Sequence, residues 1–173
     1  MAKTVPVLIG PDYEDLEVWY PKYRLEEAGF ETPLVGMGEA EYHGKHGYPA
    51  LADASVEDLD AGNLAGLVIP GGWAPDRMRR HEGLLDLVRA VHANEAMVAT
   101  ICHGPWVLIS AGILRGKKMT SFEAIRDDVI NAGAKYVDAE VVVDGNLVTS
   151  RRPSDLPAFS RAMLRVLGAR EET

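Results

Sequence analysis

The stretch VATICHGPWVLISAGIL, residues 98–114, decides the fold, and its centre is Cys102, the only cysteine of the chain. Residues 97–101 form a short apolar run, which is typical of a strand buried on both faces. From Pro105 onward apolar residues recur at helical spacing, and proline suits a first helical turn because it lacks an N–H that would be unpaired there. Three residues remain for the reversal. The stretch therefore predicts a strand, a tight elbow and a helix.

The predicted elbow gives Cys102 a chemical interpretation. A turn this short aims its side chain outward from a strained backbone, as the nucleophile elbow of serine hydrolases does. The N-terminus of the following helix carries partial positive charge, which favours thiolate over thiol. A single cysteine is otherwise more often a small buried apolar residue. The elbow and the adjacent His103 favour a nucleophile, so we expect a reactive thiol with a lowered pKa.

Strands and helices alternate on both sides of this stretch. Apolar runs predict strands at 5–9, 30–37 and 67–69, and the residues after 135 predict strands with a hairpin turn at 144–145. Residues 41–53 indicate short strands or a hairpin. Helical spacing predicts helices over about 12–29, 76–94, 120–133 and from Ser154. This alternation indicates a doubly wound, mostly parallel sheet in a single α/β domain, residues 1–173.

Two of the predicted helices carry specific expectations. In the first, Asp12 is the expected N-cap, and Pro21 predicts a kink or a late start. Its apolar stripe, expected to face inward, consists of Leu16, Trp19, Tyr20, Tyr23 and Leu25. In the helix at 120–133, Thr120 and Glu123 have the spacing of a capping box.

Composition limits the class of protein. The 173 residues carry a net charge of −8 without a basic run, which argues against nucleic acid as the main partner. No apolar stretch reaches membrane-spanning length, so we expect no membrane association. A free thiol fits a reducing compartment, and we expect a cytoplasmic protein. There is no zinc-ligand spacing and no dinucleotide fingerprint, so we expect neither metal nor cofactor.

Acidic residues follow the first predicted strand, at the edge where sites gather in such sheets. Glu14 and Glu17 are three residues apart and lie on one helical face. They are either a solvated first turn favoured by the helix dipole or a partner for the Cys102 thiol. We favour Glu17 because Glu14 and Asp15 are expected to be more exposed. A buried Glu17 beside the thiolate would have a raised pKa, since two like charges would not both persist there.

Two further groups at this edge have a functional and a structural interpretation. Gly71 and Gly72 follow the third buried strand, and their N–H groups could form an oxyanion hole, although glycine pairs more often make plain turns. His103 is a candidate general base, although adjacent side chains in a turn can point apart. Asp76 is the candidate to orient His103, and is equally typical of an acidic helix N-terminus.

With these residues assembled, the sequence resembles the PfpI branch of the DJ-1/PfpI superfamily, which is related to class I glutamine amidotransferase domains. Five segments carry the resemblance and span nearly the whole chain. They are YEDLE (13–17), GKHGY (44–48), VIPGGWAPDRMR (68–79), ICHGPWVLISAGILRGKKMTSF (101–122) and IRDDVINAGAKYVDAEVVVDGNLVTSRRPSDLPAF (125–159). Several long motifs in the right order are far more specific than any one of them.

The resemblance implies a flavodoxin-like fold and self-association as a dimer that can build into a hexamer. It implies Cys102 as nucleophile, Glu17 as its carboxylic acid partner and His103 as the triad histidine. The third triad member would come from the position of Asp76 across a subunit interface. Relatives often have Glu there, so Asp76 shortens the reach by one methylene. Many relatives have Tyr where Phe122 stands, so a substrate-binding hydroxyl would be missing here.

The resemblance also limits the function to a few activities, all of which need a reactive thiolate. The expected function is a cytoplasmic, stress-related cysteine enzyme acting on reactive carbonyls, as a glutathione-independent glyoxalase or a protein deglycase. One alternative is a PfpI-like intracellular cysteine peptidase. An alternative of another class is an oxidation-sensing or chaperone-like stress protein. The expected substrate is accordingly a small reactive carbonyl or a peptide.

Overall fold

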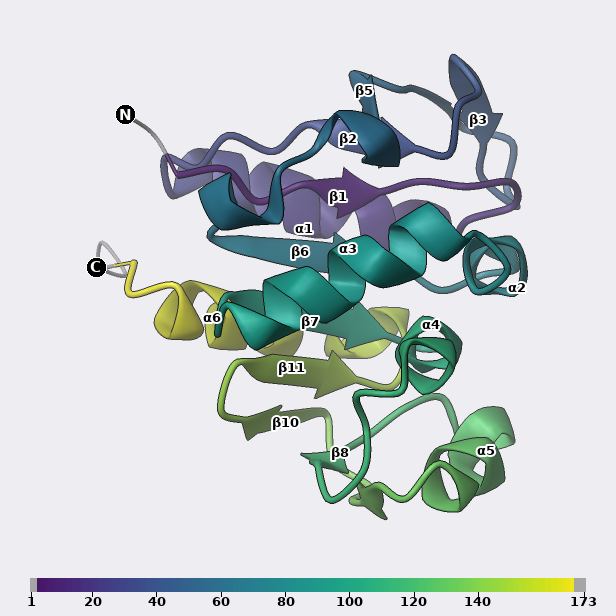
Figure 1. Ribbon diagram of the computed structural model, residues 1–173, viewed down its shortest axis with the longest axis vertical. Coiled ribbons are helices and arrows are strands. Elements are labelled where there is room, and N and C mark those ends of the chain that lie inside the picture. Colours follow the sequence, from purple (N-terminus) through teal and green to yellow (C-terminus); the bar gives the residue numbers. More distant parts are fainter. Residues whose placement is uncertain (1–2, 170–173) are drawn as a thin grey trace.

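A seven-stranded sheet runs through the computed structural model, which describes residues 3–169 (Figure 1). The strand order is β10-β11-β7-β6-β1-β2-β5. The strands are β1 Val7–Leu8, β2 Leu34–Gly36, β5 Ala54–Ser55, β6 Gly66–Ile69, β7 Met97–Ile101, β10 Val141–Asp144 and β11 Leu147–Ser150. Neighbouring strands are parallel except in the β10–β11 hairpin. The expected mostly parallel sheet is confirmed.

Helices cover both faces of this sheet. Figure 1 shows α3 in front of the sheet and α1 and α6 behind it. The helices are α1 Asp15–Glu27, α2 Ala74–Met78, α3 Glu82–Ala93, α4 Pro105–Ala111, α5 Arg126–Asn131 and α6 Leu156–Val166. Strands β1, β6 and β7 are buried along their whole length, as expected when helices cover both faces.

Short elements complete the chain. Two small sheets pair β3 Glu41–His43 with β4 Pro49–Leu51, and β8 Lys118–Met119 with β9 Lys135–Tyr136. Single 3₁₀ turns lie at Val56–Asp58, Ala61–Asn63, Glu123–Ile125 and Pro153–Asp155. Within residues 3–169, no helix has the length and apolar character needed to cross a bilayer.

The first helix differs from its prediction at its start. It begins at Asp15, because Asp12 has a φ of +56° and lies in the turn before the helix, so Asp12 is not the N-cap. Pro21 lies inside the helix, so the late start is wrong.

The buried face of α1 also differs from its prediction. Leu16, Tyr20 and Tyr23 are exposed, whereas Glu17 and Val18 are buried. The apolar spacing was misleading because the face that packs inward carries a carboxylate, and carboxylates do not count toward an apolar stripe.

Two other helix predictions are wrong in part. The helix expected over 76–94 is two helices, α2 and α3, because His81 starts the second by accepting the Leu84 N–H on its ring nitrogen at 3.2 Å. Thr120 does not cap a helix. Its N–H donates to Thr149 Oγ1 at 3.0 Å, and the helical turn begins only after Phe122.

Candidate active site

Cys102 lies in the predicted elbow, between the end of β7 and the start of α4. Its φ is +62°, a left-handed conformation that non-glycine residues rarely adopt. The Cys102 N–H donates to the Ser150 carbonyl at 3.1 Å and its carbonyl accepts the Phe122 N–H at 2.9 Å. These bonds hold the strained turn, and Cys102 as a whole residue is 9% exposed.

Glu17 reaches the thiol from α1 and is fully buried. Its Oε2 accepts the Gly71 N–H at 2.7 Å, while Oε1 has no hydrogen-bond partner among residues 3–169. Burial raises the pKa of Glu17 to about 8, and the bond from Gly71 opposes this only partly. The expected raised pKa therefore agrees with the structure.

The thiol itself differs from the expectation. Burial, and then the negative charge of Glu17, raise the pKa of Cys102, while the backbone N–H groups of His103 and Gly72 lower it. The charge of Glu17 acts in this way only when the carboxyl is ionised. The two groups therefore titrate as a pair, which loses its first proton near the raised pKa of Glu17. When the negative charge left by this first proton lies on the Cys102 sulfur, the neighbouring Glu17 carboxyl carries the remaining proton.

His103 is brought together with the thiol. Its Nδ1 lies 3.2 Å from Cys102 Sγ. Burial, and then the positive charge of Lys45, lower the pKa of His103, so the imidazole is neutral near pH 7. A neutral imidazole at hydrogen-bond distance from a thiol can accept its proton.

Gly71 and Gly72 take different positions in the site. A Cβ on Gly71 would lie 2.6 Å from Glu17 Oε2 and 2.7 Å from Cys102 Cβ, so the glycine lets the carboxyl and the thiol approach. Its N–H is engaged by Glu17 and is not free to bind a substrate oxygen, contrary to the expectation. The Gly72 N–H faces the sulfur instead and remains the candidate for an oxyanion hole.

Asp76 does not meet His103 within the described part of one chain. It lies on α2 with its side chain 55% exposed, and its carboxylate binds Arg80 at 2.8 Å. A role in orienting His103 would therefore require a neighbouring copy, as the resemblance implied.

The thiol opens into a cavity of about 260 Å³. Gly72, Cys102 and His103 form part of its wall, and Trp73, Phe122 and Pro153 add an apolar part. Two charged residues, Glu14 and Lys45, complete the lining and bind each other at 2.5 Å.

Four of these lining residues were absent from the predicted site: Glu14, Lys45, Trp73 and Pro153. Glu14 is buried rather than exposed, because Lys45 compensates its charge. The GKHGY motif, which contains Lys45, was the one signal in the sequence that pointed to this loop.

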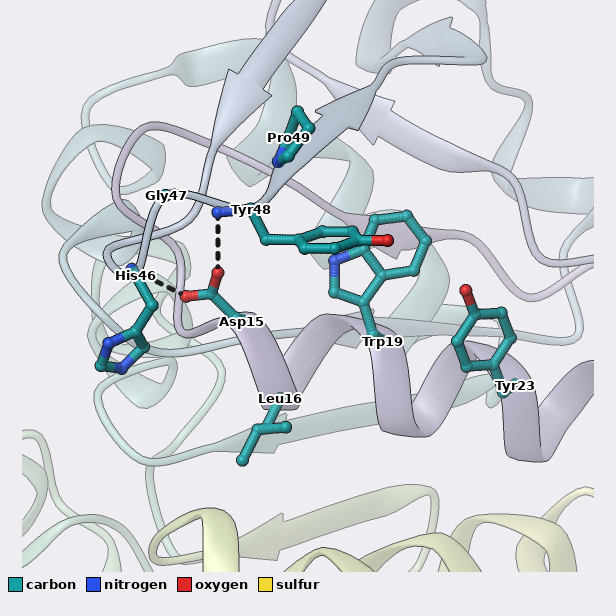
Figure 2. Close-up of a pocket in the computed structure, with 8 residues that line it drawn as sticks. All are labelled: Asp15, Leu16, Trp19, Tyr23, His46, Gly47, Tyr48 and Pro49. Atoms are coloured by element: carbon teal, nitrogen blue, oxygen red, sulfur yellow. Dashed lines mark hydrogen bonds between the residues drawn. The ribbon is translucent and has the colours of Figure 1, made fainter.

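Asp15 positions the loop that carries Lys45. Its two carboxylate oxygens accept the backbone N–H groups of His46 at 3.1 Å and Tyr48 at 3.2 Å (Figure 2). The outer side of this loop and α1 line a surface pocket of about 490 Å³, in which the Trp19 and Tyr48 rings meet edge to face.

A possible metal cluster lies beside this loop. Glu14, Asp15 and His46 each place a potential ligand atom within 4.8 Å of the others. We assign no metal to them, because the loop N–H groups occupy the Asp15 oxygens and Lys45 binds Glu14.

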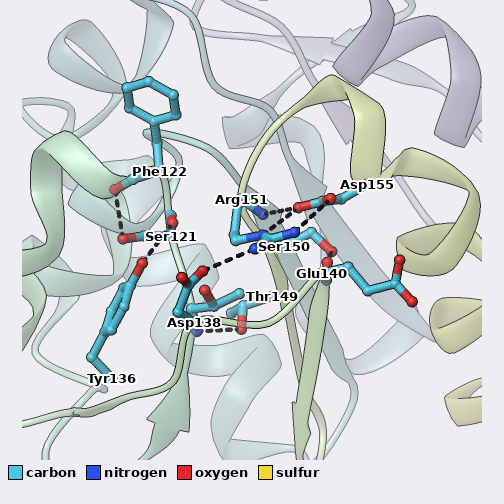
Figure 3. A network of polar contacts seen from close by, with 10 residues as sticks. Ser121, Phe122, Tyr136, Asp138, Glu140, Thr149, Ser150, Arg151 and Asp155 are labelled. Carbon is cyan, nitrogen blue, oxygen red and sulfur yellow. Dashed lines mark hydrogen bonds and ion pairs between the residues drawn. The ribbon is translucent and has the colours of Figure 1, made fainter.

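A polar network lies around the segments that carry Phe122 and Pro153, two of the residues that line the cavity (Figure 3). Ser121 Oγ donates to the Phe122 carbonyl at 2.9 Å, and the Tyr136 hydroxyl donates to the Ser121 carbonyl at 3.3 Å. Arg151 binds both Asp138 and Asp155, which fixes the turn that contains Pro153. Figure 3 shows the Phe122 ring pointing away from these contacts.

Lys45→Met is expected to raise the pKa of His103, because it removes a positive charge that disfavours the imidazolium. NMR titration of the His103 ring protons measures this. Lys117→Met is the matched control: Lys117 lowers the pKa of His92, so this variant should raise the pKa of His92 and leave that of His103 unchanged. A His103 titration that is the same in wild type and Lys45→Met would contradict the assignment.

Fold and site together define a class: mostly parallel α/β domains with a cysteine in a strained strand-to-helix turn and a buried carboxyl next to it. The DJ-1/PfpI family model matches residues 3–166, and the chain belongs to this family.

Several relatives resemble the chain over nearly its whole length. Deglycase PfpI of Pyrococcus furiosus is 45% identical over 160 residues, 92% of this chain and 96% of that protein. YraA of Bacillus subtilis, whose name suggests a cysteine protease, is 43% identical over 96% of this chain and 99% of its own.

Solved structures agree with this assignment. A two-domain protein of Anabaena variabilis with DJ-1/ThiJ/PfpI-like and ferritin-like domains is 45% identical, with a TM-score of 0.93 over 96% of this chain and 48% of that one. DJ-1beta of Drosophila melanogaster is 28% identical, with a TM-score of 0.90 over 97% of this chain and 92% of its own.

Proposed function

We propose that the protein is a cysteine-dependent enzyme acting on reactive carbonyls, of the glyoxalase or deglycase type. The observation that carries the proposal is the buried carboxyl of Glu17 beside Cys102, with a pKa near 8. A group that titrates near neutral pH can both give and take a proton during turnover. The name of the Pyrococcus furiosus relative, a deglycase, supports the same class.

The proposed reaction of a 2-oxoaldehyde uses these groups in turn. The Cys102 thiolate attacks the aldehyde carbon, a C–S bond forms, and the oxygen takes a proton from Glu17 or His103 to give a hemithioacetal. The same bases move the proton from C1 to C2 through an enediol, which leaves a 2-hydroxy thioester. Water then opens the thioester, releases the 2-hydroxy acid and returns the thiol. Neither a net oxidant nor a reductant is consumed.

The cavity favours this reaction over peptide hydrolysis. Pockets for drug-sized ligands occupy about 300–1,000 Å³, and the cavity here is smaller, about 260 Å³. A peptide substrate needs room for chain on both sides of the scissile bond. The name of YraA keeps a peptidase as the enzyme alternative.

We further propose a cytoplasmic, stress-related role and self-association as a dimer, with a hexamer as a larger assembly. Large apolar side chains exposed on α1 and the neighbouring hairpin offer surface for a second copy; they are Leu16, Tyr23, Tyr48 and Leu51. The same assembly is needed for Asp76 of one copy to contact His103 of a neighbouring copy. The mass in solution, measured by light scattering, tests it.

Cys102→Ser is expected to lower lactate formation from methylglyoxal by about 10³-fold or more, because the nucleophile is lost. Chiral assay of lactate, with a fluorogenic peptide in parallel, measures this, and Asp76→Ala reports on the proposed triad. Peptide cleavage that depends on Cys102, without lactate, would establish the peptidase instead. Stoichiometric oxidation by mild peroxide without turnover of either substrate would establish the redox sensor.

A further inference from the structure

Two aromatic rings, those of Trp73 and Phe122, line the cavity above the thiol. Phe122 is stacked against His103, with ring centroids 5.1 Å apart and planes at 28°. Trp73 lies 6.4 Å from the same imidazole at 36°. The cavity therefore has an aromatic wall beside the reacting sulfur.

Both rings are attached to backbone that is fixed around the site. The Phe122 N–H donates to the Cys102 carbonyl at 2.9 Å, so Phe122 is tied to the nucleophile itself. The Trp73 N–H donates to the Asp12 carbonyl at 2.8 Å, in the turn that leads to Glu17. The fixed backbone keeps both side chains at the wall of the cavity, so a ligand that packs on the rings has to order only the side-chain torsions.

The polar residues that line the cavity carry no net charge, so they do not require a charged substrate. Glu14 and Lys45 compensate each other across 2.5 Å, and His103 is neutral. Trp73 remains 61% exposed, a large apolar surface in contact with water. A flat apolar group beside the reacting carbonyl would cover that surface.

We propose that Trp73 and Phe122 form an aromatic subsite that makes the enzyme prefer 2-oxoaldehydes with a planar aryl substituent over those with a methyl group. This inference rests on the proposed carbonyl activity for its biological meaning. The geometry of the subsite is a property of the cavity and can be tested without that activity.

The first test compares kcat/KM for phenylglyoxal and methylglyoxal. Each aromatic contact is worth about threefold to tenfold, so Trp73→Ala and Phe122→Ala should each lower the phenylglyoxal-to-methylglyoxal ratio by that factor. Trp73→Phe keeps a ring and should retain most of the preference. Tyr20→Ala is the matched control, because Tyr20 is 37% exposed on α1, does not line the cavity and is not one of the residues named for self-association. An unchanged ratio, or an equal loss for both substrates, would overturn the subsite.

The second test needs no turnover. 2-Bromoacetophenone and bromoacetone alkylate a thiolate in the same way, with bromide as leaving group, and Cys102 is the only thiol. The alkylation rate with 2-bromoacetophenone is divided by the rate with bromoacetone, and this ratio is then divided by the same ratio for N-acetylcysteine. The normalised ratio should exceed one in wild type and fall about threefold to tenfold in Trp73→Ala. If wild type converts neither oxoaldehyde but shows this selectivity, the proposed function fails and the subsite stands. A normalised ratio of one, or one that Trp73→Ala leaves unchanged, overturns the subsite.

Discussion

Glu17→Gln is expected to abolish a fall in stability that the wild-type protein shows between about pH 5 and pH 8. The pKa of Glu17 is about 8 in the folded protein, whereas in the unfolded chain it has the ordinary value of 4.5. The folded state therefore binds more protons in this window. The free energy of unfolding is highest at a pH below the Glu17 pKa of the unfolded chain. It declines by at most about 5 kcal/mol as the pH rises through the Glu17 pKa of the folded protein. Glutamine does not titrate, so the decline should disappear.

Denaturant unfolding at several pH values measures this, with Glu39→Gln as the control, because the Glu39 side chain is exposed. The Cys102 thiol does not account for the same window, because its pKa is raised from an ordinary value of 9.0. Turnover should fall about 10²- to 10⁴-fold, because the amide cannot carry a proton. A decline of equal size in wild type and Glu17→Gln would show that the carboxyl is ionised in the folded protein.

Gly104→Ala is expected to destabilise the fold by about 2–4 kcal/mol. A Cβ there would lie 2.0 Å from Thr100 Oγ1 and 2.9 Å from the Ile69 carbonyl, so the ends of β6 and β7 would have to separate. Gly112→Ala, at the other end of α4, is the matched control. Its Cβ meets nothing within 4 Å, and only the left-handed φ of +76° costs energy, about 1 kcal/mol.

Unfolding midpoints of the two variants measure the difference. The double variant Thr100→Ala/Gly104→Ala should recover part of the loss, because it removes the nearest contact, although the carbonyls remain. Equal destabilisation by Gly104→Ala and Gly112→Ala would show that the elbow accommodates the added Cβ at position 104 without strain.

The elbow could be predicted because its signals are local. A five-residue apolar run, a cysteine and a proline in the first helical turn are adjacent in the sequence, and no distant contact is needed to interpret them. The same holds for the order of strands and helices, which follows from apolar runs of ordinary length.

The buried face of α1 could not be predicted from spacing, because a distant contact decides it. Glu17 is turned inward by a hydrogen bond from Gly71, 54 residues later in the chain. Lys45 enters the cavity because Asp15 holds its loop through two backbone N–H groups. Both arrangements bury a carboxyl side chain, Glu17 in the first and Asp15 in the second, and periodicity assigns such side chains to the surface.

The recessed position of Cys102 also has a consequence for repair after oxidation. The chain has no second cysteine to act as a resolving thiol, so a sulfenic acid at this position cannot close an internal disulfide. The sulfur lies in a cavity of about 260 Å³ and is nearly covered, which keeps bulky protein thiols from reaching it. Recovery would therefore depend on a small soluble thiol that enters the cavity, forms a mixed disulfide and is displaced by a second one.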